Sequence, residues 1–265
     1  MSAEDVRAKV RAVIPDTKAQ MAVHLNDRVK ELKALGLSST VPTQRDLIPV
    51  LAANMAAKSG GDAKSKMTDA EGQIIGNNTT ALTLSDDRYV GLDGGSPFDE
   101  LHELIHICSA KGGESPLHEW KLQMNEGAIN VFALLTAPAA GVKVDDRYTD
   151  ETRIAQKLLK LITTYGNENE GYKALYGMTF CGDRAEHFRA QFFGLVGAAY
   201  NAIPATTVPG KEGKPATSTK FRPDGKTPKP ATERTWTDNA AGDEFASKVQ
   251  NWSVKWLEDR LPALP

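Results

Sequence analysis

The strongest local signal in the chain is a helix start at Ser96. Serine is favoured as an N-cap residue, Pro97 suits the first helical position, and Asp99 adds an acidic group to the first turn. We therefore expect a helix that begins at Pro97 and runs to about Ala110, where a pair of glycines follows.

Two histidines lie within this helix, in the sequence His-Glu-Leu-Ile-His over residues 102–106. Helix positions four apart lie on one face, so His102 and His106 can reach the same metal ion. Glu103 lies beside them, where it can take a proton from a water on the metal without being a ligand itself. This pattern predicts a catalytic Zn²⁺ site, and the alternative is a pair of core histidines bonded to backbone or carboxylate groups.

A catalytic zinc takes three protein ligands, so one more is needed. Glu126 is the best candidate, because it lies on the next predicted helix (residues 116–136) among apolar neighbours. Asn130, one turn further on, is placed to support a ligand through a hydrogen bond. His118 is a rival third ligand at the start of the same helix.

These residues resemble the gluzincin group of zinc metallopeptidases, in which a glutamate on a second helix completes the His-Glu-x-x-His site. The resemblance rests on residues 102–106 and on Asn-Glu-Gly at 125–127, within a stretch of about residues 80–135. It implies peptide hydrolysis, and an edge strand before the helix that pairs with an extended substrate; residues 81–93 are in the right place. The metzincin pattern, with a Gly and a third His soon after His106, does not fit.

The resemblance also implies a His or Tyr that donates a hydrogen bond to the developing oxyanion. His187 is our first choice for this catalytic role. An equally favoured alternative is that His187 lies on a helix face and pairs with Asp183, one turn before it. Tyr89, Tyr172 and Tyr176 are the alternatives.

The chain contains two cysteines, Cys108 and Cys181. Peptide deformylases use a cysteine ligand, but theirs precedes the histidine helix, whereas Cys108 follows His106 by two positions and points away from the metal face. We expect Cys108 to be a buried thiol, with a disulfide to Cys181 left open for an oxidising compartment.

We expect an α+β fold, a mostly helical zincin-like domain with a small antiparallel sheet or hairpin before the histidine helix. The strands are expected over residues 72–78 and 80–93.

Three parts are predicted: a metallopeptidase domain over residues 1–202, a flexible loop rich in Pro, Gly, Lys and Thr over 203–235, and a C-terminal helix within 236–265 that packs on the domain. The other expected helices cover residues 3–35 with an interruption at Pro15, the stretch after Pro42, 150–165 and 183–202.

The composition sets limits on partners. The 265 residues carry a formal net charge of −2, so no basic field attracts nucleic acid, and no apolar run is long enough to span a membrane. The first residues have no apolar signal-peptide core, so we expect a cytoplasmic protein by default, with export by a signal-independent system left open. The leading hypothesis is a zinc metallopeptidase acting on a peptide or protein; the alternatives are a bacterial effector toxin with the same site, and a non-catalytic zinc-binding module.

Overall fold

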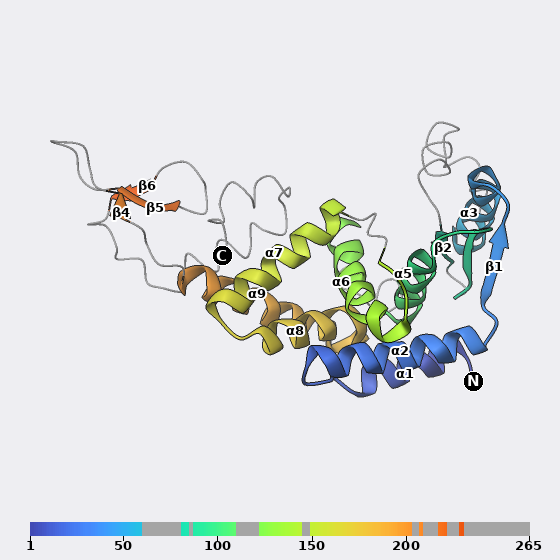
Figure 1. Cartoon of the computed structure of the whole chain (residues 1–265), viewed down its shortest axis with the longest axis horizontal. Coiled ribbons are helices and arrows are strands. Elements are labelled where there is room, and N and C mark those ends of the chain that lie inside the picture. Colours follow the sequence, from blue (N-terminus) through green and yellow to red (C-terminus); the bar gives the residue numbers. More distant parts are fainter. Residues whose placement is uncertain are drawn as a thin grey trace. The chain divides into compact units, whose positions relative to one another are not determined.

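The structure is a computed structural model that describes residues 1–59, 81–84, 87–109, 122–144, 149–202, 207–208, 217–221 and 228–230 (Figure 1). It divides into two compact units. The first contains residues 1–111 and 129–147, and the second contains residues 112–128 and 148–265. The predicted domain end at residue 202 therefore falls inside the second unit.

Within the described residues, the first unit contains four whole helices and a three-stranded sheet. Its elements are α1 (Ala3–Ala12), α2 (Lys18–Ala34), β1 (Ser38–Val41), α3 (Gln44–Ser59), β2 (Ala81–Thr83), β3 (Tyr89–Leu92) and α5 (Pro97–Cys108). Helix α6 (Leu122–Ala140) is continuous across the division between the units. The expected interruption at Pro15 is confirmed, since α1 ends before it and α2 begins after it with a capping box at Thr17.

The sheet is mixed, with the strand order β1-β3-β2. Strand β2 pairs with β3 in an antiparallel hairpin, whereas β1 pairs with β3 in parallel. The prediction of an antiparallel sheet is therefore wrong for β1, which we did not expect to be a strand. Its sequence Ser-Ser-Thr-Val is short and mostly exposed, so no apolar alternation reveals it. The first expected strand, residues 72–78, lies outside the described residues. The second, residues 80–93, was expected to be one strand, but it contains both β2 and β3 with a turn between them.

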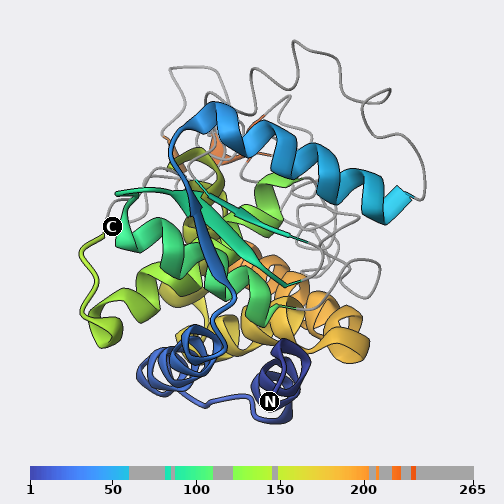
Figure 2. The ribbon, with the colours of Figure 1, turned by 90° about the vertical axis from the view of Figure 1, so that its right-hand side faces the viewer.

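The two faces of this sheet carry different side chains. One face packs on α3 through a buried cluster of Leu47, Leu84 and Val90. Side chains alternate along a strand, so Thr83 and Tyr89 lie on the other face, where β2 and β3 contact α5. Figure 2 shows α3 crossing the sheet, with α5 beyond the strands. The sheet thus lies directly against the helix that carries the two histidines.

Arg7 of α1 holds the hairpin turn in place beside α5. Its side chain is only 4% exposed, and its guanidinium donates to both carboxylate oxygens of Asp87, at 2.7 and 3.1 Å. It also donates to the backbone carbonyl of Ile107 near the end of α5, at 3.3 Å. Two-point pairing of a guanidinium with a carboxylate fixes orientation as well as distance. This contact therefore sets where β2 and β3 lie along α5.

His24 of α2 is expected to make the stability of the protein depend on pH. Burial, and then the nearby Arg28, hold the pKa of His24 below its ordinary value of 6.5, although Asp27, Glu31 and the Val10 backbone oppose the shift. Its Nε2 is buried without a hydrogen-bond partner, so a proton there is poorly accommodated. As the pH falls through 6.5, the unfolded chain takes up this proton more readily than the folded chain, so the free energy of unfolding is expected to fall.

We expect the urea midpoint of the wild type to fall more between pH 7.5 and pH 5.5 than that of His24→Gln. Glutamine does not titrate in this range, whereas its amide can still donate a hydrogen bond to the α1 backbone. Urea unfolding of both proteins at both pH values measures the effect. Equal decreases of the urea midpoint in the two proteins would show that His24 does not cause the pH dependence.

The second unit contains α7 (Thr149–Tyr165), α8 (Glu168–Phe180), the short 3-10 helix η4 (Gly182–Arg184) and α9 (Ala185–Ala202). The helices expected over residues 150–165 and 183–202 are confirmed, but α8 was not expected. Its two glycines weaken the sequence signal, and the structure shows why they suit it. A Cβ on Gly177 would lie 2.2 Å from the Phe188 ring, and one on Gly171 would lie 3.0 Å from the Ile162 side chain. The glycines thus allow α8 to pack closely on α7 and α9.

Three short strands lie in the segment expected to be a flexible loop. They are β4 (Thr207–Val208), β5 (Thr217–Phe221) and β6 (Pro228–Pro230), which pair in that order as an antiparallel sheet. The C-terminal helix expected within residues 236–265 lies outside the described residues. Among the helices that are described, none combines the length and the apolar character that crossing a membrane requires.

Candidate metal centre

Helix α5 begins as the sequence predicts. The Ser96 hydroxyl accepts a hydrogen bond from the Phe98 backbone N–H at 3.2 Å, and Pro97 is the first helical residue. The helix ends at Cys108, slightly earlier than expected, because Ser109 leaves the helical conformation while its N–H still bonds the last turn. Both histidines therefore lie in regular helix, one turn apart.

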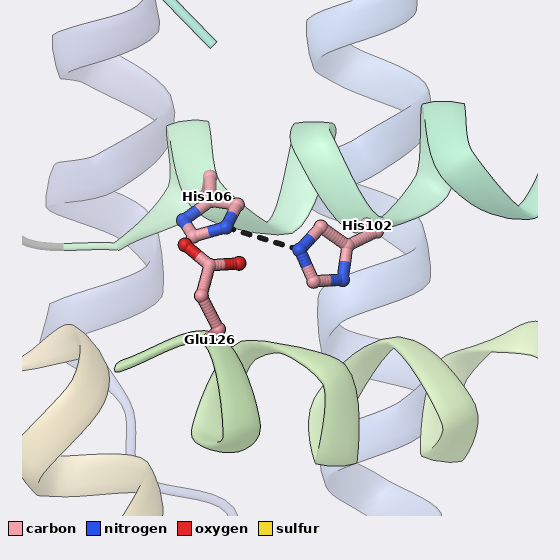
Figure 3. Close-up of side chains that lie close together, drawn as sticks. All are labelled: His102, His106 and Glu126. Carbon is pink, nitrogen blue, oxygen red and sulfur yellow. Dashed lines mark hydrogen bonds between the residues drawn. The ribbon is translucent and has the colours of Figure 1, made fainter. Parts of the chain in front are cut away.

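His102, His106 and Glu126 form a cluster that can hold a metal ion. One ligand atom from each residue lies within 4.8 Å of the others. The histidines come from α5 and the carboxylate from the first turns of α6, as Figure 3 shows. His102 is buried, whereas His106 and Glu126 are half-buried. The predicted third ligand, Glu126, is thus brought to the two histidines.

The spacing of the two imidazoles fits a shared metal ion. Their Nε2 atoms lie 3.1 Å apart. Two nitrogens bound to one tetrahedral zinc, each at about 2.0–2.1 Å, lie about 3.4 Å from each other. Only a small movement separates the observed arrangement from that geometry. A carboxylate with two imidazoles is also a donor set that zinc favours.

Asn130 selects which nitrogen of His102 is available to a metal. Its side-chain oxygen lies 3.2 Å from His102 Nδ1, and both side chains are fully buried. An amide oxygen only accepts, so Nδ1 is the protonated nitrogen and Nε2 keeps its lone pair. Nε2 is the atom that faces His106. The predicted contact of Asn130 with a candidate ligand is confirmed, and that ligand is His102.

Glu103 lies outside this cluster, although it directly follows His102. Its side chain is 6% exposed, and one carboxylate oxygen accepts a hydrogen bond from the Thr83 hydroxyl at 2.6 Å. The same hydroxyl lies 3.0 Å from the Glu103 backbone oxygen. We did not expect Thr83 to contribute to the site. The alternation of Leu82 and Leu84 contains the signal, since it puts Thr83 on the opposite face of the strand.

The role of His187 as an oxyanion donor stays a prediction. His187 is exposed on α9, with its ring edge-on to Phe188 at 5.5 Å between centroids, in the unit that does not hold the histidines. Tyr89 lies on the sheet face that meets α5, and burial, followed by the charges of Glu100 and Glu103, raises the pKa of its hydroxyl. That hydroxyl therefore stays protonated at neutral pH.

Three further candidates lie on other parts of the chain. Tyr172 and Tyr176 lie on α8, where Tyr176 is fully buried. The rival third ligand His118 lies outside the described residues. No residue in this group is shown to belong to the centre.

The two cysteines are free and buried. Burial raises the pKa of the Cys108 thiol to about 12, so the neutral thiol predominates at physiological pH. Burial also raises the pKa of Cys181. Cys108 is not among the clustered ligand atoms, which agrees with the expectation that it is a structural thiol.

Comparison of the chain with protein-family models, curated proteins and solved structures gave no match. The resemblance to gluzincins therefore rests on the residues of the site and on their arrangement.

Proposed function

We propose that the protein is a zinc-dependent hydrolase of the gluzincin type that cleaves peptide bonds. The observation that carries this proposal is the cluster of His102, His106 and Glu126 with Glu103 beside it but outside it. A module that only holds a metal does not require a buried carboxylate that lies beside the ligands without joining them. A hydrolase needs that group as its general base.

The number of ligands also favours catalysis over a structural metal. Structural zinc sites are usually closed by four protein ligands, often cysteines, whereas catalytic sites keep a position open. Three ligand residues cluster among the described residues, and two of them are half-buried. Among the described residues, three protein ligands would leave a fourth position on zinc open.

In the proposed reaction His102, His106 and Glu126 hold the metal, and Asn130 keeps His102 in the correct tautomer. A bound zinc supplies Lewis acidity, which lowers the pKa of a water molecule and polarises the substrate carbonyl. Glu103 accepts the proton of the attacking water and passes it to the leaving amine nitrogen. One carboxylate thus serves first as base and then as acid.

The edge of the sheet supports a peptide as the substrate. The Leu84 N–H bonds the Arg88 carbonyl, which fixes Leu84 and Arg88 as a hydrogen-bonded pair. Such pairs alternate along an antiparallel ladder, so the N–H and C=O of Thr83 point away from β3. No strand within the described residues pairs with that outer edge of β2. An extended peptide can add there as a further strand.

Metal removal tests this proposal. Zinc-loaded protein is expected to release peptides from dye-labelled casein, and treatment with a chelator to lower the rate by more than about 100-fold, since the attacking water loses its activation. One equivalent of added zinc should restore the rate. A zinc-loaded protein that leaves both casein and a random peptide library intact contradicts the proposal, as does equal cleavage after chelation.

A further inference from the structure

The hydroxyl of Thr83 makes a contact that the proposed reaction does not yet use. Thr83 lies at the end of β2, twenty positions before Glu103 in sequence, and its Oγ1 lies 2.6 Å from a Glu103 carboxylate oxygen. Its distance to the Glu103 backbone oxygen is longer, 3.0 Å. A hydroxyl donates one hydrogen, and the shorter contact is to the charged acceptor. The bond therefore joins the sheet to the end of the Glu103 side chain.

A glutamate in this position needs such a partner. Glu103 is 6% exposed, so little water reaches its carboxylate. A buried carboxylate without a hydrogen bond is costly, and a glutamate side chain has several rotamers to choose from. The hydrogen bond from Thr83 satisfies one oxygen of the Glu103 carboxylate, and the other oxygen can accept a proton. It also directs the side chain out of the ligand cluster and toward β2, where a peptide strand would lie.

We propose that Thr83 is a positioning residue that holds the Glu103 carboxylate in the orientation required for proton transfer. This inference rests on the proposed function. Thr83 acts through Glu103 and does not touch the metal or the reacting bond. Because its main chain faces the open edge of β2, the same residue links the strand where a peptide would pair to the base that acts on it.

The position of β2 that this contact requires is itself fixed by other residues. Asp87, in the turn that follows β2, is held by Arg7, and Arg7 also bonds the α5 carbonyl of Ile107. Strand and helix are therefore connected at the turn as well as at Thr83. The hydroxyl thus comes from a strand whose place along α5 is set by an ion pair, and a substitution that removes only this hydroxyl leaves those contacts intact.

Thr83→Val tests the inference, because valine keeps the shape of threonine and removes the hydroxyl. On dye-labelled casein we expect kcat to fall about 10- to 100-fold, the effect of losing a hydrogen bond to a charged group. KM should stay within about twofold, since the main chain of β2 is unchanged, and zinc content should stay at the wild-type value. Thr83→Ser restores the hydroxyl and should return kcat to within about threefold of wild type.

Ser39→Ala is the matched control. It removes a hydroxyl hydrogen bond from the same sheet, to the Tyr89 carbonyl, that does not involve Glu103. We expect it to keep the wild-type kcat. A Thr83→Val protein with wild-type kcat, or one that Thr83→Ser does not rescue, overturns the inference.

Crystal structures of the metal-free wild type and Thr83→Val separate this inference from the proposed function. The Glu103 carboxylate should lie within hydrogen-bond distance of Thr83 in the wild type and move or lose order in the variant. An unchanged Glu103 rotamer in the variant overturns the positioning role, whatever the activity. A changed rotamer in a protein that cleaves no peptide supports the Thr83 contact and contradicts only the proposed function.

Discussion

Replacing Glu103 by glutamine is expected to lower the rate of casein cleavage by about 10²- to 10⁴-fold, the range that general acid–base groups contribute. Glutamine has nearly the same size and can still accept a hydrogen bond from Thr83. It cannot take a proton from water at neutral pH. Because Glu103 lies outside the cluster of ligand atoms, the variant should bind zinc as tightly as the wild type.

The decisive measurement is therefore a pair of values on one sample, the zinc content and the initial rate of cleavage. Glu100→Gln is the matched control, since Glu100 is on the same helix but forms an ion pair with Lys33 at 2.7 Å. It should keep both values. If Glu103→Gln cleaved casein at the wild-type rate, Glu103 would not be the base, and the proposed mechanism would be wrong.

The helix with the two histidines could be predicted from the sequence because its signals are local. Ser96 and Pro97 determine where α5 begins, and the four-residue spacing of His102 and His106 determines that they share a face. Local signals alone could not predict Glu126 as a ligand, since its position depends on how α6 packs on α5. Its apolar neighbours and the family resemblance pointed to a carboxylate that the structure does bring to the two histidines.

What could not be predicted depends on contacts between distant parts of the chain. Thr83 is separated from Glu103 by a hairpin turn whose position is set by Arg7, and no local pattern encodes that ion pair. Strand β1 exists because β3 offers it an edge, and its own residues barely favour a strand. Helix α8 contains glycines that lower its helix propensity but permit close packing. In each case the tertiary partner decides the outcome.

The second large effect is expected for Glu126→Gln, which should weaken zinc binding by more than about 100-fold. Loss of a supporting partner such as Asn130 typically costs 10- to 100-fold in metal affinity, and loss of a charged ligand should cost more. Only two imidazoles would then remain in the cluster. Competition with a chromogenic chelator measures the affinity, and zinc content after dialysis gives an independent value.

Two further variants show whether the loss belongs to Glu126 itself. Glu31→Gln also removes a half-buried carboxylate, one that pairs with Lys9 and Arg28 on the surface of α1 and α2, and it should keep full zinc affinity. His118→Gln removes the rival ligand, and this variant should also keep full zinc affinity. If zinc stayed bound in Glu126→Gln but was lost in His118→Gln, the third ligand would be His118. The metal site would then consist of His102, His106 and His118, and Glu126 would not be a ligand.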